Sequence, residues 1–390
     1  MIDYENTVSR VARDIKPSGI RKFFDIAATM DDVISLSIGE PDFDTPWHIR
    51  EAGIISLEQG KTHYTSNAGL LELREAISEY LSRRFKLTYA AEEIVVTVGG
   101  SEGIDAAIRT LVEPGDEVLI PEPAFVCYDP LTRLAGGVPK PIVTRAEDEF
   151  RLTAEALKEA ITPKTKLLVL PYPNNPTGAV MRREDLEAIA DVLRDTNIYV
   201  LSDEIYAELT YGKVRHISFA SIKGMAERTI LVSGFSKSFA MTGWRLGYIA
   251  APAPLTKIML KVHQYGIMSS PSTSQYAAVE AMVNGDGDIA AMRTEYNDRR
   301  KFLLKGLREL GFPTFEPLGA FYIFPSVSHL GMSSEEFCKK LIQEQRLAVV
   351  PGNAFGESGE GHVRISYAYS KAHLKEALRR LEIFVKDHKR

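Results

Sequence analysis

Short apolar runs alternate with amphipathic stretches over residues 90–250. A short apolar run bounded by turn-forming residues is typical of a buried strand, and apolar residues at helical spacing predict a helix. The predicted strands are 93–98, 116–121, 166–173, 198–204, 229–234 and 246–251, and the predicted helices are 101–112 and 183–195. This alternation predicts an α/β fold with a mainly parallel sheet between helices. Ligands bind such sheets at the carboxyl ends of the strands, so motifs there are expected to meet at one edge.

The two ends of the chain follow a different pattern. Near the N-terminus, SLSIGEPDFDTP predicts a short strand and then a turn rich in Gly, Pro and Asp. After GDGD, a long helical stretch precedes short apolar runs and two further amphipathic helices, which predicts a small α+β domain. We therefore expect an N-terminal arm with part of the small domain at 1–44, a large domain at 45–285 and a small C-terminal domain at 286–390.

The composition is that of a soluble globular protein and excludes several classes. The 390 residues exceed what one hydrophobic core usually holds, and 45% of them are hydrophobic and 25% charged. With a net charge of −5, there is no electrostatic reason to expect a nucleic-acid or anionic-membrane partner. No run of about 18 apolar residues predicts a membrane span, and the charged N-terminus lacks the apolar segment of a signal peptide.

Cysteine and histidine usage limits the remaining classes. The two cysteines, Cys127 and Cys338, are too few for a disulfide framework, so we expect a cytoplasmic protein. The eight histidines lie at no spacing typical of metal ligands, so no metal site is expected.

The densest chemical signal is SGFSKSFAMTGWRLGY at 233–248. Lys237 follows an apolar run and stands among small and aromatic residues. Burial disfavours the charged form of a lysine, and a neutral amine can attack an aldehyde to form a Schiff base. Arg245 lies eight positions on and could bind a phosphate through its forked guanidinium. Without further context, a lysine and an arginine at this spacing are more often solvated surface residues.

Three further motifs lie at predicted strand ends. TVGGSEG could present the backbone N–H groups of Gly100, Ser101 and Glu102 to an anion, or could be a plain strand–helix turn. Asp203 in SDEIY could pair with the ring nitrogen of a cofactor, or could cap a helix that begins at EIYAEL. Asn175 in PYPNNPTG could hydrogen-bond to a phenolic oxygen, or could belong to an ordinary Asn-Pro turn.

Taken together and in this order, the motifs resemble the pyridoxal 5′-phosphate (PLP) enzymes of fold type I, specifically the class I/II aminotransferases. The resemblance includes GEPDF and VRISY and runs from about residue 17 to the C-terminus. The chain is most similar to the bacterial aminotransferase A and aromatic aminotransferase group. The resemblance implies PLP as the cofactor. It also implies ping-pong transfer of an amino group from an L-amino acid to a 2-oxo acid, with 2-oxoglutarate as the expected acceptor.

The resemblance also implies roles around the cofactor. Lys237 would form the Schiff base with PLP and later move a proton between the substrate Cα and the cofactor C4′. Asp203, supported by Tyr128, would pair with the pyridinium nitrogen. The other ring contacts would come from Asn175 and Tyr206 at O3′ and from Phe125 on the ring face. The phosphate would be held by Gly100, Ser101, Glu102, Ser236 and Arg245.

Three further positions bear on which groups bind the cofactor phosphate. Many relatives carry a serine where this chain has Gly234, so one phosphate hydrogen bond is in doubt. Tyr64 matches a tyrosine that reaches the phosphate of the neighbouring subunit, and Ser269 is expected to do the same. The resemblance therefore implies a homodimer with shared active sites.

For the substrate, Arg364 in VRISYAYS matches the arginine that binds the α-carboxylate in a bidentate manner. Gly39 would add a backbone N–H, and the segment around it is expected to close over the substrate. Some aspartate aminotransferases carry an arginine for the distal carboxylate where this chain has Tyr265, which favours aromatic or mixed aromatic and dicarboxylic substrates. Other lining of the substrate pocket is expected from Asn175, Tyr128, Phe355 and Ile20.

The sequence leaves other functions open. A PLP-dependent C–S β-lyase would use the same fold and cofactor, but would release pyruvate and ammonia from cystathionine without a keto acid. A PLP-binding transcriptional regulator would carry an N-terminal winged-helix domain, whereas only about 30 residues precede VISLSIGEPDF. An α/β binding protein without a cofactor is the remaining alternative.

Overall fold

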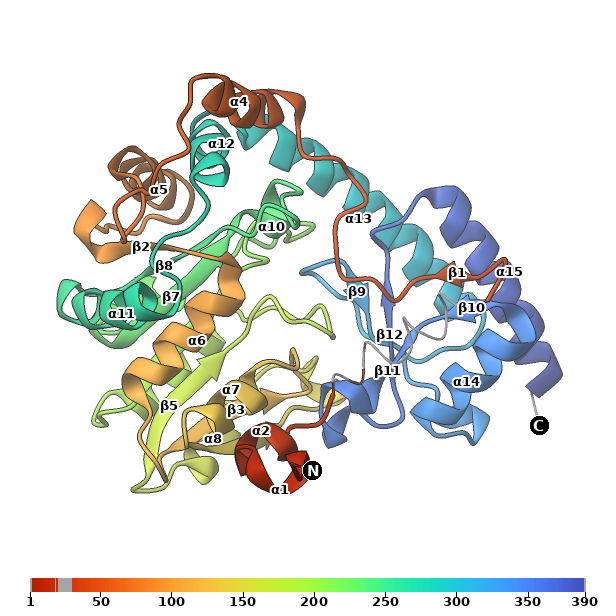
Figure 1. Ribbon diagram of the computed structural model, residues 1–390. Coiled ribbons are helices and arrows are strands. Elements are labelled where there is room, and N and C mark those ends of the chain that lie inside the picture. The colour runs from red at the N-terminus through yellow and green to blue at the C-terminus, as the bar shows by residue number, and fades with distance from the viewer. Residues whose placement is uncertain (1, 18, 20–29, 389–390) are drawn as a thin grey trace.

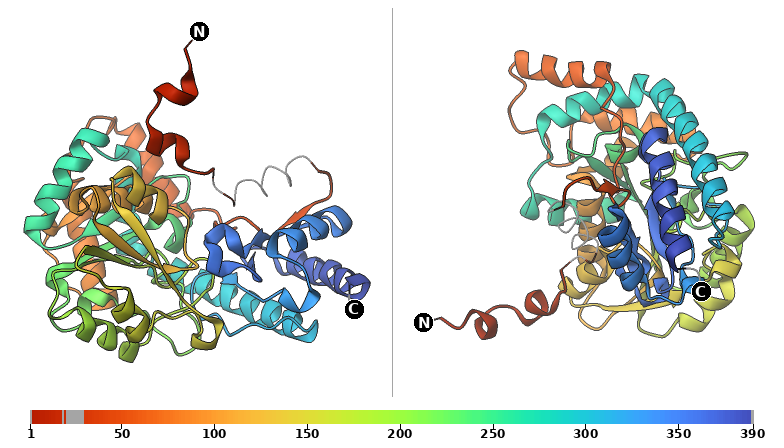
Figure 2. Two further views of the ribbon diagram at one scale, coloured as in Figure 1. Left: turned by 90° about the horizontal axis from the view of Figure 1, so that it is seen from below. Right: turned by 90° about the vertical axis from the view of Figure 1, so that its right-hand side faces the viewer.

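The computed structural model describes residues 2–17, 19 and 30–388. A larger α/β body and a smaller α+β body lie side by side and are joined by the long helix α13 (Asp286–Glu309) (Figure 1). At the N-terminus, α1 (Tyr4–Thr7) projects from the rest of the molecule (Figure 2), whereas α2 (Arg10–Asp14) contacts α7 (Tyr128–Leu134). Among the described residues, no helix combines the length and apolarity needed to cross a bilayer.

A seven-stranded sheet forms the centre of the larger body. Its strand order is β2-β8-β7-β6-β5-β3-β4, and every strand is parallel to the others except β8, which is antiparallel to both neighbours. The strands are β2 (Ile94–Thr97), β3 (Glu117–Glu122), β4 (Val138–Val143), β5 (Thr165–Leu170), β6 (Tyr199–Asp203), β7 (Thr229–Gly234) and β8 (Gly247–Ala250). The mainly parallel sheet expected from the sequence is thus confirmed.

Helices cover both faces of this sheet because neighbouring strand residues point to opposite sides. In β7, Ile230 and Val232 pack into the core under α6 (Gly99–Leu111) and α11 (Ala253–Gly266), whereas Leu231 packs into the core under α5 (Leu71–Phe85) and α12 (Ser272–Asn284). The first face is covered by α6, α7 and α11. The second is covered by α5, α8 (Ala154–Ala160), α9 (Arg183–Leu193) and α12, with α4 (Trp47–Glu58) packed on α12.

The sequence pattern does not predict edge strand β4. This strand contains Pro139 and Pro141 and is mostly exposed, so no apolar run marks it. Prolines are tolerated on an edge strand because some of its N–H groups have no ladder partner. The direction of β8 is also unexpected from alternation alone. Only α10 (Phe235–Ser238), a single helical turn, lies between β7 and β8, and the chain returns antiparallel.

The smaller body has its own core and two short sheets. One sheet is antiparallel, with β9 (Tyr322–Ile323), β11 (Val350–Pro351) and β12 (Val363–Ser366) in the order β11-β12-β9. In the other, β1 (Ile34–Ser35) pairs parallel with β10 (Leu347–Ala348), which places this N-terminal segment in the smaller body. The helices α13, α14 (Ser334–Gln345) and α15 (Lys371–His388) complete the core.

Helix α13 belongs to both cores. Ile289, in its first turns, packs with α5 and α12, whereas Leu303 packs in the smaller body. The helix begins directly after Gly285, inside the predicted boundary motif. The domain limits themselves remain a prediction.

Candidate active site

The carboxyl ends of the parallel strands meet at one cavity of about 330 Å³, within the range of about 300–1,000 Å³ typical of small-molecule sites. Predicted residues that line it from the larger body's strand ends are Gly100, Ser101, Phe125, Tyr128, Asn175 and Asp203. Those that complete it are Gly39, Tyr206, Ser236, Lys237, Arg245 and Arg364. The motifs therefore come together as the sheet topology requires.

Lys237 enters the cavity from α10, directly after β7. Its Nζ donates a hydrogen bond to the carbonyl oxygen of Gly39 at 2.6 Å. Burial lowers the pKa of the Lys237 amine to about 8, and the cations of Arg364 and Arg245 add to this effect against the opposing charge of Glu40. A lysine with such a pKa is partly neutral near pH 8, and the neutral form is the nucleophile.

Asp203 lies at the end of β6 with a buried carboxylate. Tyr128 Oη donates to Asp203 Oδ2 at 2.7 Å, and the N–H of Ile205 donates to Oδ1 at 3.2 Å. Burial raises the pKa of the Asp203 carboxyl, while both hydrogen bonds oppose the rise. The alternative in which Asp203 caps a helix is wrong, because residues 205–208 form turns. A buried carboxylate that faces a cavity is suited to a cationic partner there.

Close glycine contacts shape the first turn of α6. Gly99 has φ +73°, and a Cβ on it would lie 2.8 Å from Nη2 of Arg245. A Cβ on Gly247 would lie 2.6 Å from the carbonyl carbon of Gly99 and 2.7 Å from the N atom of Gly100. These glycines let β8 and the guanidinium approach the helix N-terminus, where free N–H groups favour an anion.

Glu102 does not line the cavity with the other predicted phosphate ligands. Its carboxylate accepts from the N–H of Val98 and from Nδ1 of His263. As the fourth residue of α6, it also stands where a backbone N–H normally bonds within the helix. The geometry therefore favours the N–H groups of Gly100 and Ser101 as anion donors, and the prediction for Glu102 gains no support.

Gly234 has a packing explanation. A Cβ at this position would lie 2.9 Å from Cα of Gly247 and 3.0 Å from the carbonyl oxygen of Leu246. A serine would therefore push against the backbone of β8. Ser236, two residues on, lines the cavity.

Arg364 reaches the cavity from β12, while its neighbours Val363 and Ile365 face the smaller core as expected. The guanidinium Nη1 donates to Oδ1 of Asn175 at 2.9 Å, and Nη2 donates to the carbonyl oxygen of Ser37. Its Cζ lies 4.5 Å from the ring centre of Tyr322 and 4.9 Å from that of Phe355. Nε is buried without a protein partner among the described residues, so Arg364 retains a donor for a ligand.

Tyr322 is a cavity residue that the sequence analysis does not find. Its hydroxyl lies 2.9 Å from the hydroxyl of Tyr206. A Cβ on Gly39 would lie 2.6 Å from the same oxygen, so a glycine is needed there. In the sequence, Tyr322 is one tyrosine in the apolar run AFYIFPSV. The pairing of that run with β12, the strand of Arg364, cannot be predicted from the local sequence.

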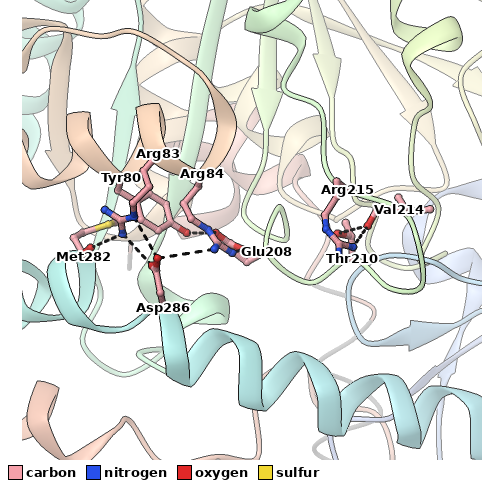
Figure 3. Close-up of polar contacts among 9 residues, drawn as sticks. All are labelled: Tyr80, Arg83, Arg84, Glu208, Thr210, Val214, Arg215, Met282 and Asp286. Carbon is pink, nitrogen blue, oxygen red and sulfur yellow. Dashed lines mark hydrogen bonds and ion pairs between the residues drawn. The ribbon is translucent and has the colours of Figure 1, made fainter.

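The segment that carries Asp203 and Tyr206 is anchored by the buried Glu208 (Figure 3). Tyr80 Oη and two guanidinium nitrogens of Arg84 donate to the Glu208 carboxylate, with Nε at 2.8 Å. On the same helix, Arg83 Nη2 pairs with Oδ1 of Asp286 at 3.0 Å, at the start of α13 (Figure 3). One network thus joins the cofactor-site segment, α5 and the junction between the two bodies.

Besides Glu102, four predicted residues do not line the cavity of their own chain: Tyr64, Tyr265, Ser269 and Phe355, whose ring is buried beside Arg364. Tyr64 and Tyr265 are 85% and 88% exposed, and Ser269 is partly buried. Any contact of Tyr265 with a substrate must therefore come from a neighbouring subunit. Ile20 lies outside the described residues.

The residues that line the cavity fit PLP. The cavity combines an anion-binding helix start beside Arg245, a buried carboxylate for a ring nitrogen, the Phe125 ring and a lysine amine of lowered pKa. Within the described part of the chain, no cluster of His, Cys, Asp and Glu is arranged to hold a metal ion.

Comparison with known proteins gives a consistent result. The family model described as aminotransferase class I and II matches residues 31–381. The chain is 52% identical to the putative aminotransferase YugH of Bacillus subtilis, over 97% of this chain and 98% of that protein. It is 48% identical to an aspartate aminotransferase of Pyrococcus abyssi, over 96% and 97% of the two chains.

A solved structure extends the likeness to three dimensions. The aromatic aminotransferase from Pyrococcus horikoshii superposes with a TM-score of 0.90 at 46% identity, over 95% of this chain and 99% of that chain. The chain therefore belongs to the class I and II aminotransferases, which are PLP-dependent enzymes of fold type I.

Proposed function

We propose that this aminotransferase moves the amino group of an aromatic, or mixed aromatic and dicarboxylic, L-amino acid to 2-oxoglutarate by a ping-pong mechanism. The observation that carries the proposal is that the Lys237 amine, with a pKa of about 8, and the Arg364 guanidinium line one cavity. An amino acid bound by its carboxylate at Arg364 would present its Cα to a group able to hold and release a proton.

Each residue of the cavity would have a separate role in the reaction. Bound PLP supplies an electron sink for the bond that breaks at the substrate Cα. Asp203 would keep the ring nitrogen protonated, and Lys237 would take the proton from Cα and return it at C4′. Asn175 accepts from Arg364 through Oδ1, so its amide N–H groups remain free for O3′. Asn175 would thus link the substrate carboxylate site to the cofactor.

The side-chain preference rests on the charges in the cavity. Among the described residues that line it, the cationic ones are Lys237, Arg245 and Arg364. The reacting amine, the phosphate and the α-carboxylate would use all three, which leaves none in the same chain for a distal carboxylate. The ring of Tyr322, which lines the cavity beside Arg364, favours an aromatic side chain. A dicarboxylic substrate would need a cation from the neighbouring subunit.

We also propose that the enzyme is a cytoplasmic homodimer with shared sites. Tyr64 is exposed, yet its loop is held in place: Ser272 Oγ donates to the carbonyl oxygen of His63 at 2.7 Å, and Gln275 Nε2 donates to Oγ1 of Thr65 at 3.0 Å. Further exposed apolar residues in neighbouring elements are Trp47, Ile54, Ile55, Leu57, Tyr265, Ile267 and Met268. Exposed apolar surface of this kind marks an interface.

A screen of amino donors with 2-oxoglutarate tests the function. We expect glutamate to form fastest with phenylalanine, tyrosine or tryptophan, and each donor alone to convert the bound cofactor to its amine form, as a ping-pong mechanism requires. Lys237→Ala is expected to abolish turnover. Near-normal turnover by Lys237→Ala, or pyruvate release from cystathionine without a keto acid as the main activity, would overturn the proposal.

A further inference from the structure

A buried pair of side chains closes the turn at the start of α6. Glu102 Oε2 accepts from the backbone N–H of Val98, and Oε1 accepts from His263 Nδ1 at 2.6 Å. His263 comes from α11, and its side chain is fully buried. One carboxylate thus joins the residue before the helix to a second helix.

This contact closes a turn that carries residues of the cavity. Gly99, Gly100 and Ser101 lie between Val98 and Glu102, and of these three Gly100 and Ser101 line the cavity at the phosphate end. Val98 is the N-cap residue of α6, so its N–H has no partner within the helix. With Glu102 as its acceptor, the turn forms a closed loop that sets the direction of the N–H groups at 100 and 101.

Electrostatics alone would disfavour an acid at this position. A carboxylate in the first turn of a helix is favourable to the helix dipole, but it repels a phosphate bound at the same N-terminus. The His263 side chain also has a cost, because its Nε2 is buried without a partner in the described structure. A carboxylate that repels a phosphate, held by a histidine with an unpaired polar atom, needs another reason to be there.

We infer that Glu102 and His263 are positioning residues for the phosphate-binding turn. They hold residues 98–101 in the shape in which the N–H groups of Gly100 and Ser101 meet the PLP phosphate. This inference rests on PLP as the cofactor of the proposed function. It replaces the expected direct contact of Glu102 with the phosphate by an indirect one.

The test compares two probes on cofactor-free enzyme: PLP, and pyridoxal, which lacks the phosphate. Dissociation constants are measured from the visible absorbance of the Lys237 adduct. Glu102→Leu has neither a hydrogen-bond donor nor an acceptor, so both the Val98 and the His263 contact are lost. We expect PLP binding to weaken at least about tenfold, as for the loss of a charge-assisted hydrogen bond, and pyridoxal binding to stay unchanged.

A charge-matched control lies on the same helix. Asp105 pairs with Arg109 Nε at 2.8 Å near the surface and forms no hydrogen bond with residues 98–102, so Asp105→Asn removes one negative charge without freeing Val98. We expect Asp105→Asn to bind PLP as tightly as the wild type or more tightly. If the role of Glu102 is positioning, its variant weakens PLP binding whereas the Asp105 variant does not, and this difference separates positioning from charge.

Two histidine variants keep the test independent of folding defects. Asn places an amide N–H near the position of Nδ1, so His263→Asn is expected to retain PLP affinity, whereas His263→Leu, without a donor, is expected to weaken it. The inference is overturned if Glu102→Leu binds PLP as well as the wild type, or if PLP and pyridoxal binding weaken equally. A wild-type enzyme that forms no adduct at Lys237 would instead refute the proposed function itself.

Discussion

The amine of Lys237 is surrounded by protein, and its titration has a measurable consequence. Because burial lowers its pKa from 10.5 to about 8, the amine is protonated and unreactive below this pH and neutral above it. We expect the rate of PLP uptake by cofactor-free enzyme to rise with pH and to level off just above pH 8. Stopped-flow absorbance on both sides of pH 8 checks this, and a rate that keeps rising toward pH 10.5 would contradict it.

The same pKa shift affects stability without cofactor. Between pH 8 and 10.5 the unfolded chain binds the Lys237 proton and the folded chain does not, so this residue makes the free energy of unfolding rise with pH through that window. Lys237→Met should remove this contribution. Urea unfolding of both cofactor-free proteins at the two ends of the window measures the difference, and equal slopes would count against the lowered pKa.

Gly234 provides a packing test at one residue. In Gly234→Ala the new Cβ would press on the backbone of β8, so we expect the free energy of unfolding to fall by about 1–3 kcal/mol, the usual cost of overpacking. Gly243→Ala is the control, because a Cβ there meets no atom within 4 Å and should change stability by less than about 0.5 kcal/mol. Equal stability of the two variants in urea unfolding would refute the packing explanation.

Site residues at strand ends could be predicted from sequence, and those defined by tertiary contacts could not. Asp203 is the last residue of an apolar strand and Lys237 lies shortly after another, so both the motifs and their places in the sheet can be predicted from the sequence. Tyr322 comes from the smaller body and meets Tyr206 only through tertiary packing. For Glu102, the predicted helix began at 101, whereas α6 begins at Gly99, and the Glu102 carboxylate accepts from the N–H of Val98, a contact that the sequence pattern does not predict.

At the level of elements, the Glu208 network holds the segment after β6 to α5. Glu208→Ala would leave the buried Tyr80 hydroxyl without its acceptor, while the partly exposed Arg84 guanidinium keeps Asp286 at 3.9 Å, so we expect a loss of about 1–3 kcal/mol in the free energy of unfolding. Arg83→Ala removes a half-exposed pair from the same helix and should cost less than about 1 kcal/mol. Chemical denaturation measures both, and similar losses would contradict the assignment.

The elements that the sequence missed share a physical cause. Apolar runs mark strands that are buried on both faces, such as β6 and β7, and these were predicted to within two residues. Edge strand β4 is mostly exposed, whereas the short strand predicted at the start of SLSIGEPDFDTP forms as β1 through its pairing with β10. Hydrophobic periodicity along the sequence reflects burial, so it does not predict exposed strands that form mainly by pairing with another segment.

At the scale of the whole molecule, the cavity draws on both bodies. Lys237 and Asp203 come from the larger body, and Arg364 and Tyr322 come from the smaller one. The β1–β10 pairing and the shared helix α13 join distant parts of the chain around it. A change in the angle between the bodies would therefore alter the distance between the reacting amine and the carboxylate site.

A second copy of the chain would complete this arrangement if Tyr64 reaches the neighbouring phosphate. In a twofold dimer of Tyr64→Ala and Lys237→Ala subunits, one site carries both defects and the other carries none. Random mixing should therefore restore about a quarter of wild-type activity at limiting PLP, since about half of the dimers are hybrids with one intact site. The two variants are refolded together, and hybrids are counted by mass tags. Hybrids that form without recovery of activity would show that each subunit builds its site alone, and Tyr64 would then be an exposed tyrosine with no part in binding the cofactor.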